Sequence, residues 1–124
     1  VFMYAGHGAQ SPANEAFKSI DPTGKDEGIV CVDSRHDGTP DLADKELAVL
    51  LERVARNQPH LAVIFDCCHS GSGTRSVDEL LGARSRHTGP ADTRDLDSYL
   101  EGFYKKQQDS GRGLFIPKSR HVLM

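Results

Sequence analysis

Short apolar runs that end in small-residue turns divide this chain into predicted strands. Leu61 to Phe65 contains no polar position, which predicts a strand buried on both faces, as in a parallel sheet. Shorter runs predict strands at 1–4 and 28–33, and the apolar residues that follow His121 predict the start of another. The chain starts and stops within predicted strands, so we expect it to be a piece of a longer protein.

Two segments repeat apolar residues at the spacing of an amphipathic helix. We expect Asp41 to cap the first helix, which ends before Asn57 and Pro59 and has one apolar face: Leu47, Leu50, Leu51 and Val54. The second begins at Asp92 or Thr93, and its apolar face is Leu96, Tyr99, Leu100 and Phe103. Because the first helix lies between two predicted strands, the order predicts an α/β crossover onto a largely parallel sheet. Residues 9–27 and 74–90 are expected to be irregular.

Composition limits the classes of function. A chain of 124 residues with a net charge of −3 forms at most one domain and offers no basic face for nucleic acid. No apolar run approaches the roughly 18 residues of a membrane span, so we expect no membrane partner. Three cysteines, two of them adjacent, do not form a disulfide framework. We therefore expect a reducing, cytoplasmic setting.

Two turns that follow predicted strands carry the candidate chemistry. His7 lies between two glycines in Tyr4-Ala5-Gly6-His7-Gly8, and two thiols follow an acid in Asp66-Cys67-Cys68-His69-Ser70-Gly71. A cysteine and a distant histidine at strand ends are typical of a cysteine nucleophile with an imidazole base. Side chains alternate along a strand, so Asp66 and Cys68 are expected on one side and Cys67 on the other. A zinc site is disfavoured because adjacent cysteines cannot readily ligate one tetrahedral ion.

This pair of motifs resembles the metacaspases and the bacterial caspase-like (orthocaspase) cysteine peptidases, over about residues 1–75. The resemblance implies a caspase-like three-layer αβα sandwich with a mostly parallel central sheet. The chain, 1–124, would be part of one such domain, with the catalytic motifs in 1–75 and a variable loop and helix in 76–124. The remaining parts of the full-length protein would complete it.

The same resemblance implies a cysteine endopeptidase that acts on protein or peptide substrates through a dyad of His7 and Cys68 and an acyl-enzyme. It assigns the backbone amides of Gly8 and Cys68 to the oxyanion hole. It also places Asp66 in the specificity pocket, where the carboxylate would bind an Arg or Lys side chain. Ala5 stands where the family more often has serine.

Several alternatives stay open. Calcium-dependent metacaspases use clustered aspartates, and Asp33 and Asp44 match part of such a cluster, but the ammonium of Lys45 opposes a hard cation. Asp41 and Asp44 would otherwise be helix-capping residues, and the peptidase chemistry itself needs no cofactor. A catalytically silent scaffold is disfavoured because both dyad residues are present, and a CHAT- or separase-like peptidase is the other alternative. Three arginines in 74–90 predict that the enzyme cleaves itself within this segment: Arg75, Arg84 and Arg86.

Overall fold

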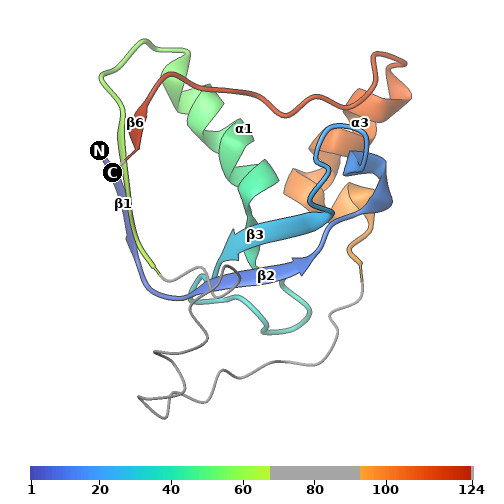
Figure 1. The fold of residues 1–124 in the computed structure, drawn as a ribbon, viewed down its shortest axis with the longest axis horizontal. Helices are drawn as coiled ribbons and strands as arrows, with labels where there is room; N and C mark the ends of the chain where they lie inside the picture. The colour runs from blue at the N-terminus through green and yellow to red at the C-terminus, as the bar shows by residue number, and fades with distance from the viewer. Residues whose placement is uncertain (68–92, 124) are drawn as a thin grey trace.

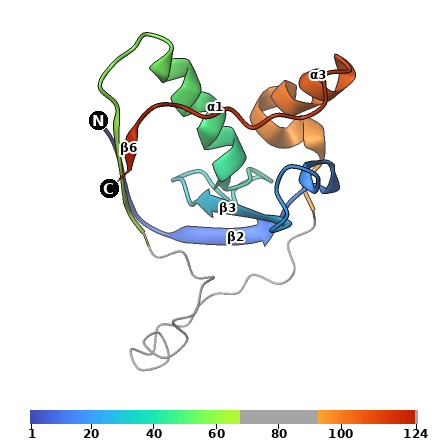
Figure 2. The same cartoon turned by 45° about the horizontal axis from the view of Figure 1, so that its top comes forward.

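The computed structural model describes residues 1–67 and 93–123, and within them a three-stranded parallel sheet carries the two ends of the chain. Its strands are β1 (Phe2–Ala5), β5 (Ala62–Asp66) and β6 (Val122–Leu123), in the order β1-β5-β6. Figures 1 and 2 show the two termini side by side at this sheet. The predicted parallel strands at the start, middle and end of the chain are therefore confirmed. The segment 74–90 lies outside the described residues.

A second sheet is antiparallel, and the sequence pattern did not predict an antiparallel sheet. It consists of β2 (Gly8–Pro12), β3 (Lys25–Ile29) and β4 (Leu42–Ala43), in that order. The expectation of an irregular segment at 9–27 was wrong at both of its ends. These strands are rich in small and polar residues, so they lack the alternation of apolar positions that marks a half-buried strand. Their backbone pairing, from Gly8 opposite Ile29 to Pro12 opposite Lys25, forms the sheet instead.

The strand expected at 28–33 ends early, at Ile29. Beyond it, the carbonyl of Val30 accepts a hydrogen bond from the hydroxyl of Tyr4, and the amide of Cys31 donates to the hydroxyl of Ser34. These contacts turn the chain out of the sheet, so Val32 is 98% exposed and Cys31 is only half-buried. Residues 30–33 therefore lie outside the strand that was expected to include them.

Helix α1 (Asp44–Ala55) leads into β5 and ends before Asn57, as predicted. Its start differs, because Asp41 forms a bidentate pair with Arg35 rather than a cap. The cap is made by Glu46, whose carboxylate accepts a hydrogen bond from the amide of Ala43 at 2.8 Å. The buried face also differs from the predicted stripe. Val49, Leu51 and two charged residues, Lys45 and Glu46, are buried, whereas Val54 is half exposed.

The single helix expected from residue 92 or 93 is broken into two. A 3-10 segment, η2 (Leu96–Gly102), is followed by α3 (Phe103–Asp109), and Leu100 and Glu101 inside η2 adopt left-handed conformations that kink it. The break occurs where the amide of Leu100 leaves the helical pattern and donates to Glu46 on α1. A longer-range contact has therefore overridden a regular helical spacing.

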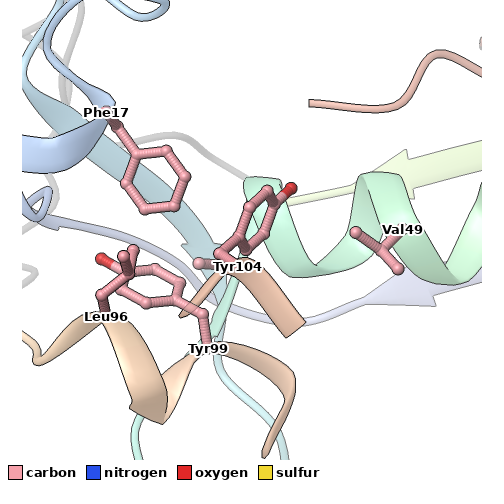
Figure 3. Packing of buried hydrophobic residues seen from close by; sticks show 6 residues of the cluster. Phe17, Val49, Leu96, Tyr99 and Tyr104 are labelled. Atoms are coloured by element: carbon pink, nitrogen blue, oxygen red, sulfur yellow. The ribbon is translucent and has the colours of Figure 1, made fainter. Parts of the chain in front are cut away.

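The core lies between α1, the short 3-10 segment η1 (Glu15–Phe17) and the C-terminal elements. Figure 3 shows the rings of Phe17, Tyr99 and Tyr104 close together. The ring of Phe17 meets the two tyrosine rings edge-on, at centroid distances of 5.1 and 4.9 Å. Val49 and Leu96 complete the buried cluster with Ala43. In Figures 1 and 2, α1 runs between the parallel sheet and α3.

The described residues thus form an α/β structure with a parallel sheet and packed helices, and the three-layer sandwich stays a prediction. Within that part of the chain, no helix has both the length and the apolar character needed to span a bilayer.

Candidate active site

The turn that carries His7 joins the two sheets. Gly6 and His7 separate β1 from β2, and the amide of Gly6 donates to the carbonyl of Asp66 at 3.2 Å. On its other side, the carbonyl of His7 accepts a hydrogen bond from the amide of Val30 at 3.0 Å. The exposed side chain of His7 is therefore held on a backbone that is tied to both the parallel and the antiparallel sheet.

Parallel pairing brings the two predicted motifs together. Ala5 lies opposite Asp66 in the register of β1 and β5, so both motifs begin at the carboxyl end of the same sheet. In open α/β sheets, this edge is where ligands bind. The His7 turn and the end of β5 at Asp66 therefore lie at one edge of the parallel sheet.

The second motif is described only as far as Cys67. The side chain of Asp66 is exposed at the end of β5, and the next residue, Cys67, is half-buried. The expected alternation of Asp66, Cys67 and Cys68 across the strand end stays a prediction. Cys68, the predicted nucleophile, and His69 lie outside the described residues.

The register of the antiparallel sheet sets the direction of the Gly8 amide. Val30 donates to His7, so the neighbouring pair of Gly8 and Ile29 is a non-hydrogen-bonded pair of the ladder. In such a pair, the N–H groups point away from the partner strand. The N–H of Gly8 is thus directed to the side of β2 away from β3.

Lys45 lies beside Asp44, one of the two aspartates of the calcium hypothesis, and beside two aspartates that the hypothesis did not include, Asp21 and Asp26. Its ammonium lies 2.7 Å from Asp21, 2.9 Å from Asp26 and 3.4 Å from Asp44, and its side chain is 1% exposed. Burial alone would lower the pKa of Lys45, but hydrogen bonds with Asp21 and Asp26 outweigh burial and raise this pKa above its ordinary value. Three carboxylates therefore share one resident cation, the ammonium of Lys45.

These residues do not fit a calcium site. A calcium ion takes six to eight oxygens, and here an ammonium group already fills the space between the carboxylates. Asp33 is exposed in the loop after β3, where its carbonyl accepts a hydrogen bond from the amide of His36. Across residues 1–67 and 93–123, no group of three or more His, Cys, Asp or Glu side chains is arranged to hold a metal ion.

Two features escaped the sequence prediction. The hydroxyl of Tyr4 reaches the His7 turn, although an apolar run gave no reason to read Tyr4 as more than a strand residue. Asp26 lies buried between Lys45 and the hydroxyl of Tyr99, which donates to its carboxylate. The only sequence signal for the second feature was an aspartate in a segment where the chain otherwise appeared irregular.

Comparison with known proteins gives the family. Residues 1–76, more than half of the chain, match the model of the metacaspase peptidase C14 domain. Metacaspase-1A of Aspergillus fumigatus is 39% identical over 71 residues, which cover 57% of this chain and 16% of that protein. Metacaspase-8 of Arabidopsis thaliana is 35% identical over 92 residues, which cover 74% of this chain and 22% of that protein.

The chain therefore spans about a fifth or less of the length of these curated relatives. No solved structure matches it significantly. The match of the family model over both catalytic-motif turns, together with the parallel register that aligns them, leads to one conclusion: this chain belongs to the metacaspase family of cysteine peptidases.

Proposed function

We propose that the protein containing this chain is a cysteine endopeptidase that cleaves after Arg or Lys, with Cys68 as the nucleophile and His7 as the base. The observation that carries the proposal is the hydrogen bond from Gly6 to Asp66, with Ala5 opposite Asp66 in the parallel register. It supports a site at one sheet edge to which both motifs contribute. The family match over residues 1–76 supports the class of chemistry.

In the proposed reaction, the imidazole of His7 takes the proton of the Cys68 thiol. The thiolate attacks the scissile carbonyl carbon, and the carbonyl oxygen becomes an oxyanion that the amides of Gly8 and Cys68 would stabilise. The imidazolium then protonates the leaving amine as the peptide bond breaks, which leaves a thioester. Water hydrolyses this acyl-enzyme, releases the carboxylic acid and restores the thiol.

The exposed carboxylate of Asp66 would select the substrate. Asp66 is the last residue of β5 and precedes Cys68, the proposed nucleophile, by two residues. A carboxylate at this place would pair with the cationic side chain on the acyl side of the scissile bond. The chemistry uses no metal ion, and a thiol nucleophile suits a reducing compartment such as the cytoplasm.

The test uses the full-length protein and fluorogenic peptides with Arg, Lys, Asp or Leu before the scissile bond. We expect turnover of the Arg and Lys peptides, and we expect Cys68→Ala and His7→Ala each to abolish it. Cys67→Ala is the matched control, because it removes the adjacent thiol and should retain most activity. If Cys67→Ala loses turnover while Cys68→Ala keeps it, the nucleophile is Cys67 and our assignment of Cys68 is wrong.

A further inference from the structure

The hydroxyl of Tyr4 bridges two backbone carbonyls at the candidate site. It donates to the carbonyl oxygen of His7 at 2.9 Å and to that of Val30 at 2.8 Å, so its one proton is shared between them. Val30 also donates its own amide to His7. Tyr4 therefore ties the His7 turn to the end of β3 at the point where the ladder of the antiparallel sheet stops.

Gly6 makes room for this contact. A Cβ atom at position 6 would lie 2.6 Å from the hydroxyl oxygen of Tyr4 and 2.9 Å from its Cζ, closer than real Cβ atoms approach. Gly6 is not among the glycines with positive φ, so its conformation does not by itself require glycine. Glycine at position 6 leaves space for the ring of Tyr4, so the hydrogen bonds of the Tyr4 hydroxyl depend on Gly6.

The carbonyl that Tyr4 holds belongs to the same peptide plane as the amide of Gly8. A trans peptide is rigid, and its C=O and N–H point in opposite directions. Fixing the carbonyl of His7 toward β3 therefore fixes the N–H of Gly8 away from β3, toward the side where an oxyanion would form. In residues 1–67 and 93–123, no side chain hydrogen-bonds to the imidazole of His7, so within them the ring is placed through its backbone.

We propose that Tyr4 is a positioning residue of the peptidase reaction, which orients both the His7 base and the Gly8 amide through its hydroxyl. This inference rests on the proposed function. The hydroxyl acts on groups that are used as charge develops in the transition state, so its loss should lower kcat rather than raise KM.

Tyr4→Phe in the full-length protein removes the hydroxyl and keeps the ring. Removing an oxyanion donor outright costs about 100-fold or more, and here the Val30 contact remains, so we expect kcat on an Arg peptide to fall about tenfold with KM changed less than about twofold. Amide hydrogen exchange at Val30 should become faster. Tyr104→Phe is the matched control, because it also removes a hydroxyl that donates to a backbone carbonyl, that of Lys45 at 2.7 Å, and it should retain kcat.

Each of the following results would test the positioning role of Tyr4. A kcat for Tyr4→Phe equal to that of wild type, or a loss of kcat no larger than that of Tyr104→Phe, would overturn the positioning role. Unchanged hydrogen exchange at Val30 would do the same. If wild-type protein turns over no peptide, the proposed function fails, and the exchange rates then show separately whether Tyr4 fixes the turn.

Discussion

The ammonium of Lys45 is enclosed by three aspartates, and its position explains how charged residues enter the core of this chain. Asp26, 2% exposed, receives a hydrogen bond from Tyr99 on one oxygen and faces Lys45 with the other. Burial tends to raise the pKa of Asp21, but hydrogen bonds from Lys45 and Thr23 outweigh it and lower this pKa below the ordinary 3.8. Each charge in this network thus depends on its partners, because an unpaired charge is costly in a buried position.

The pH dependence of this network follows from its pKa shifts. The pKa of Asp21 is lowered in the folded state, so its contribution to stability is complete above pH 3.8 and is lost as the pH falls through the lower, folded value. The pKa of Lys45 is raised, so its contribution is complete below pH 10.5 and is lost as the pH rises through the higher, folded value. Between these limits the contributions of Asp21 and Lys45 are both present.

Replacing Lys45 by methionine should destabilise the fold strongly. The substitution leaves the buried carboxylate of Asp26 without its counterion, and breaking a buried pair in this way costs about 3–5 kcal/mol. Urea denaturation of the full-length protein at pH 7 measures the change. The difference from wild type should shrink below pH 3.8, as the pH falls through the lowered, folded pKa of Asp21.

Arg56→Ala is the control for this experiment, because Arg56 also pairs with a carboxylate, that of Glu52, but on the exposed side of α1. It should leave the urea midpoint unchanged. Equal midpoints for Lys45→Met and Arg56→Ala would show that the buried network does not stabilise the fold.

The proposed role of Asp66 in specificity gives a second prediction for a single residue. Asp66→Asn keeps the shape of the side chain and removes its charge, so kcat/KM on Arg and Lys peptides should fall at least about thirtyfold, the effect of losing about 2 kcal/mol of a desolvated charge pair. Cleavage of the Leu peptide in the same assay serves as the control. An equal loss on basic and Leu peptides would mean that Asp66 supports the fold and does not select the substrate.

Among the elements, α1 contacts both the residue before its start and the C-terminal part of the chain through the side chain of Glu46. One oxygen of its carboxylate accepts hydrogen bonds from Arg94 at 2.8 Å and from the amide of Leu100 at 3.1 Å, and the other accepts from Arg94 at 3.2 Å and from the amide of Ala43 at 2.8 Å. Arg94 also stacks over the ring of Tyr99 at 4.1 Å. The side chain of Glu46 therefore caps the start of α1 and also holds the C-terminal segment η2.

Glu46→Gln should release η2 from α1. The neutral amide cannot balance the partly buried guanidinium of Arg94, so we expect a loss of about 2–4 kcal/mol, in the range of a broken buried pair. Limited trypsin digestion should then cut after Arg94, which the wild-type contacts protect. Glu52→Gln on the same helix is the matched control and should leave Arg94 resistant. Resistance of Arg94 in Glu46→Gln would contradict the anchoring role.

At the scale of the whole molecule, two sheets of different type meet at the His7 turn. The strand β5 of the parallel sheet ends at Asp66, and β2 of the antiparallel sheet begins at Gly8, next to the hydrogen bond between Val30 and His7. The Lys45 network lies at the start of β3, where the ammonium of Lys45 donates to the carbonyl of Lys25.

Removal of divalent cations should leave activity unchanged. The buried ammonium of Lys45 already lies between Asp21 and Asp26, and binding of a calcium ion there would require its displacement. Assays of the full-length protein in EGTA and in millimolar calcium should give values of kcat/KM within about twofold of each other, with the same protein in magnesium as the control for ionic strength. Stimulation by calcium of more than tenfold would contradict this prediction.

The local patterns of the chain were sufficient for the parts of the molecule whose structure depends on neighbours in sequence. The apolar runs at β1 and β5 and the extent of α1 toward Asn57 follow from such patterns. So do the two turns that carry His7 and Asp66, whose residue types indicated the family that the comparisons confirm. Hydrophobic spacing predicts these features because burial of one face or both faces fixes the period of the side chains.

Only the tertiary structure decided where the polar residues go. The pairing of β2 with β3, the burial of Lys45 and Glu46, and the break at Leu100 all depend on partners that lie far away in the sequence. Tyr99 is 73 residues from Asp26, and Arg94 is 48 residues from Glu46. A charge or a hydroxyl is stable inside a protein when its partner is placed against it, and that placement is a property of the folded chain and not of any local pattern.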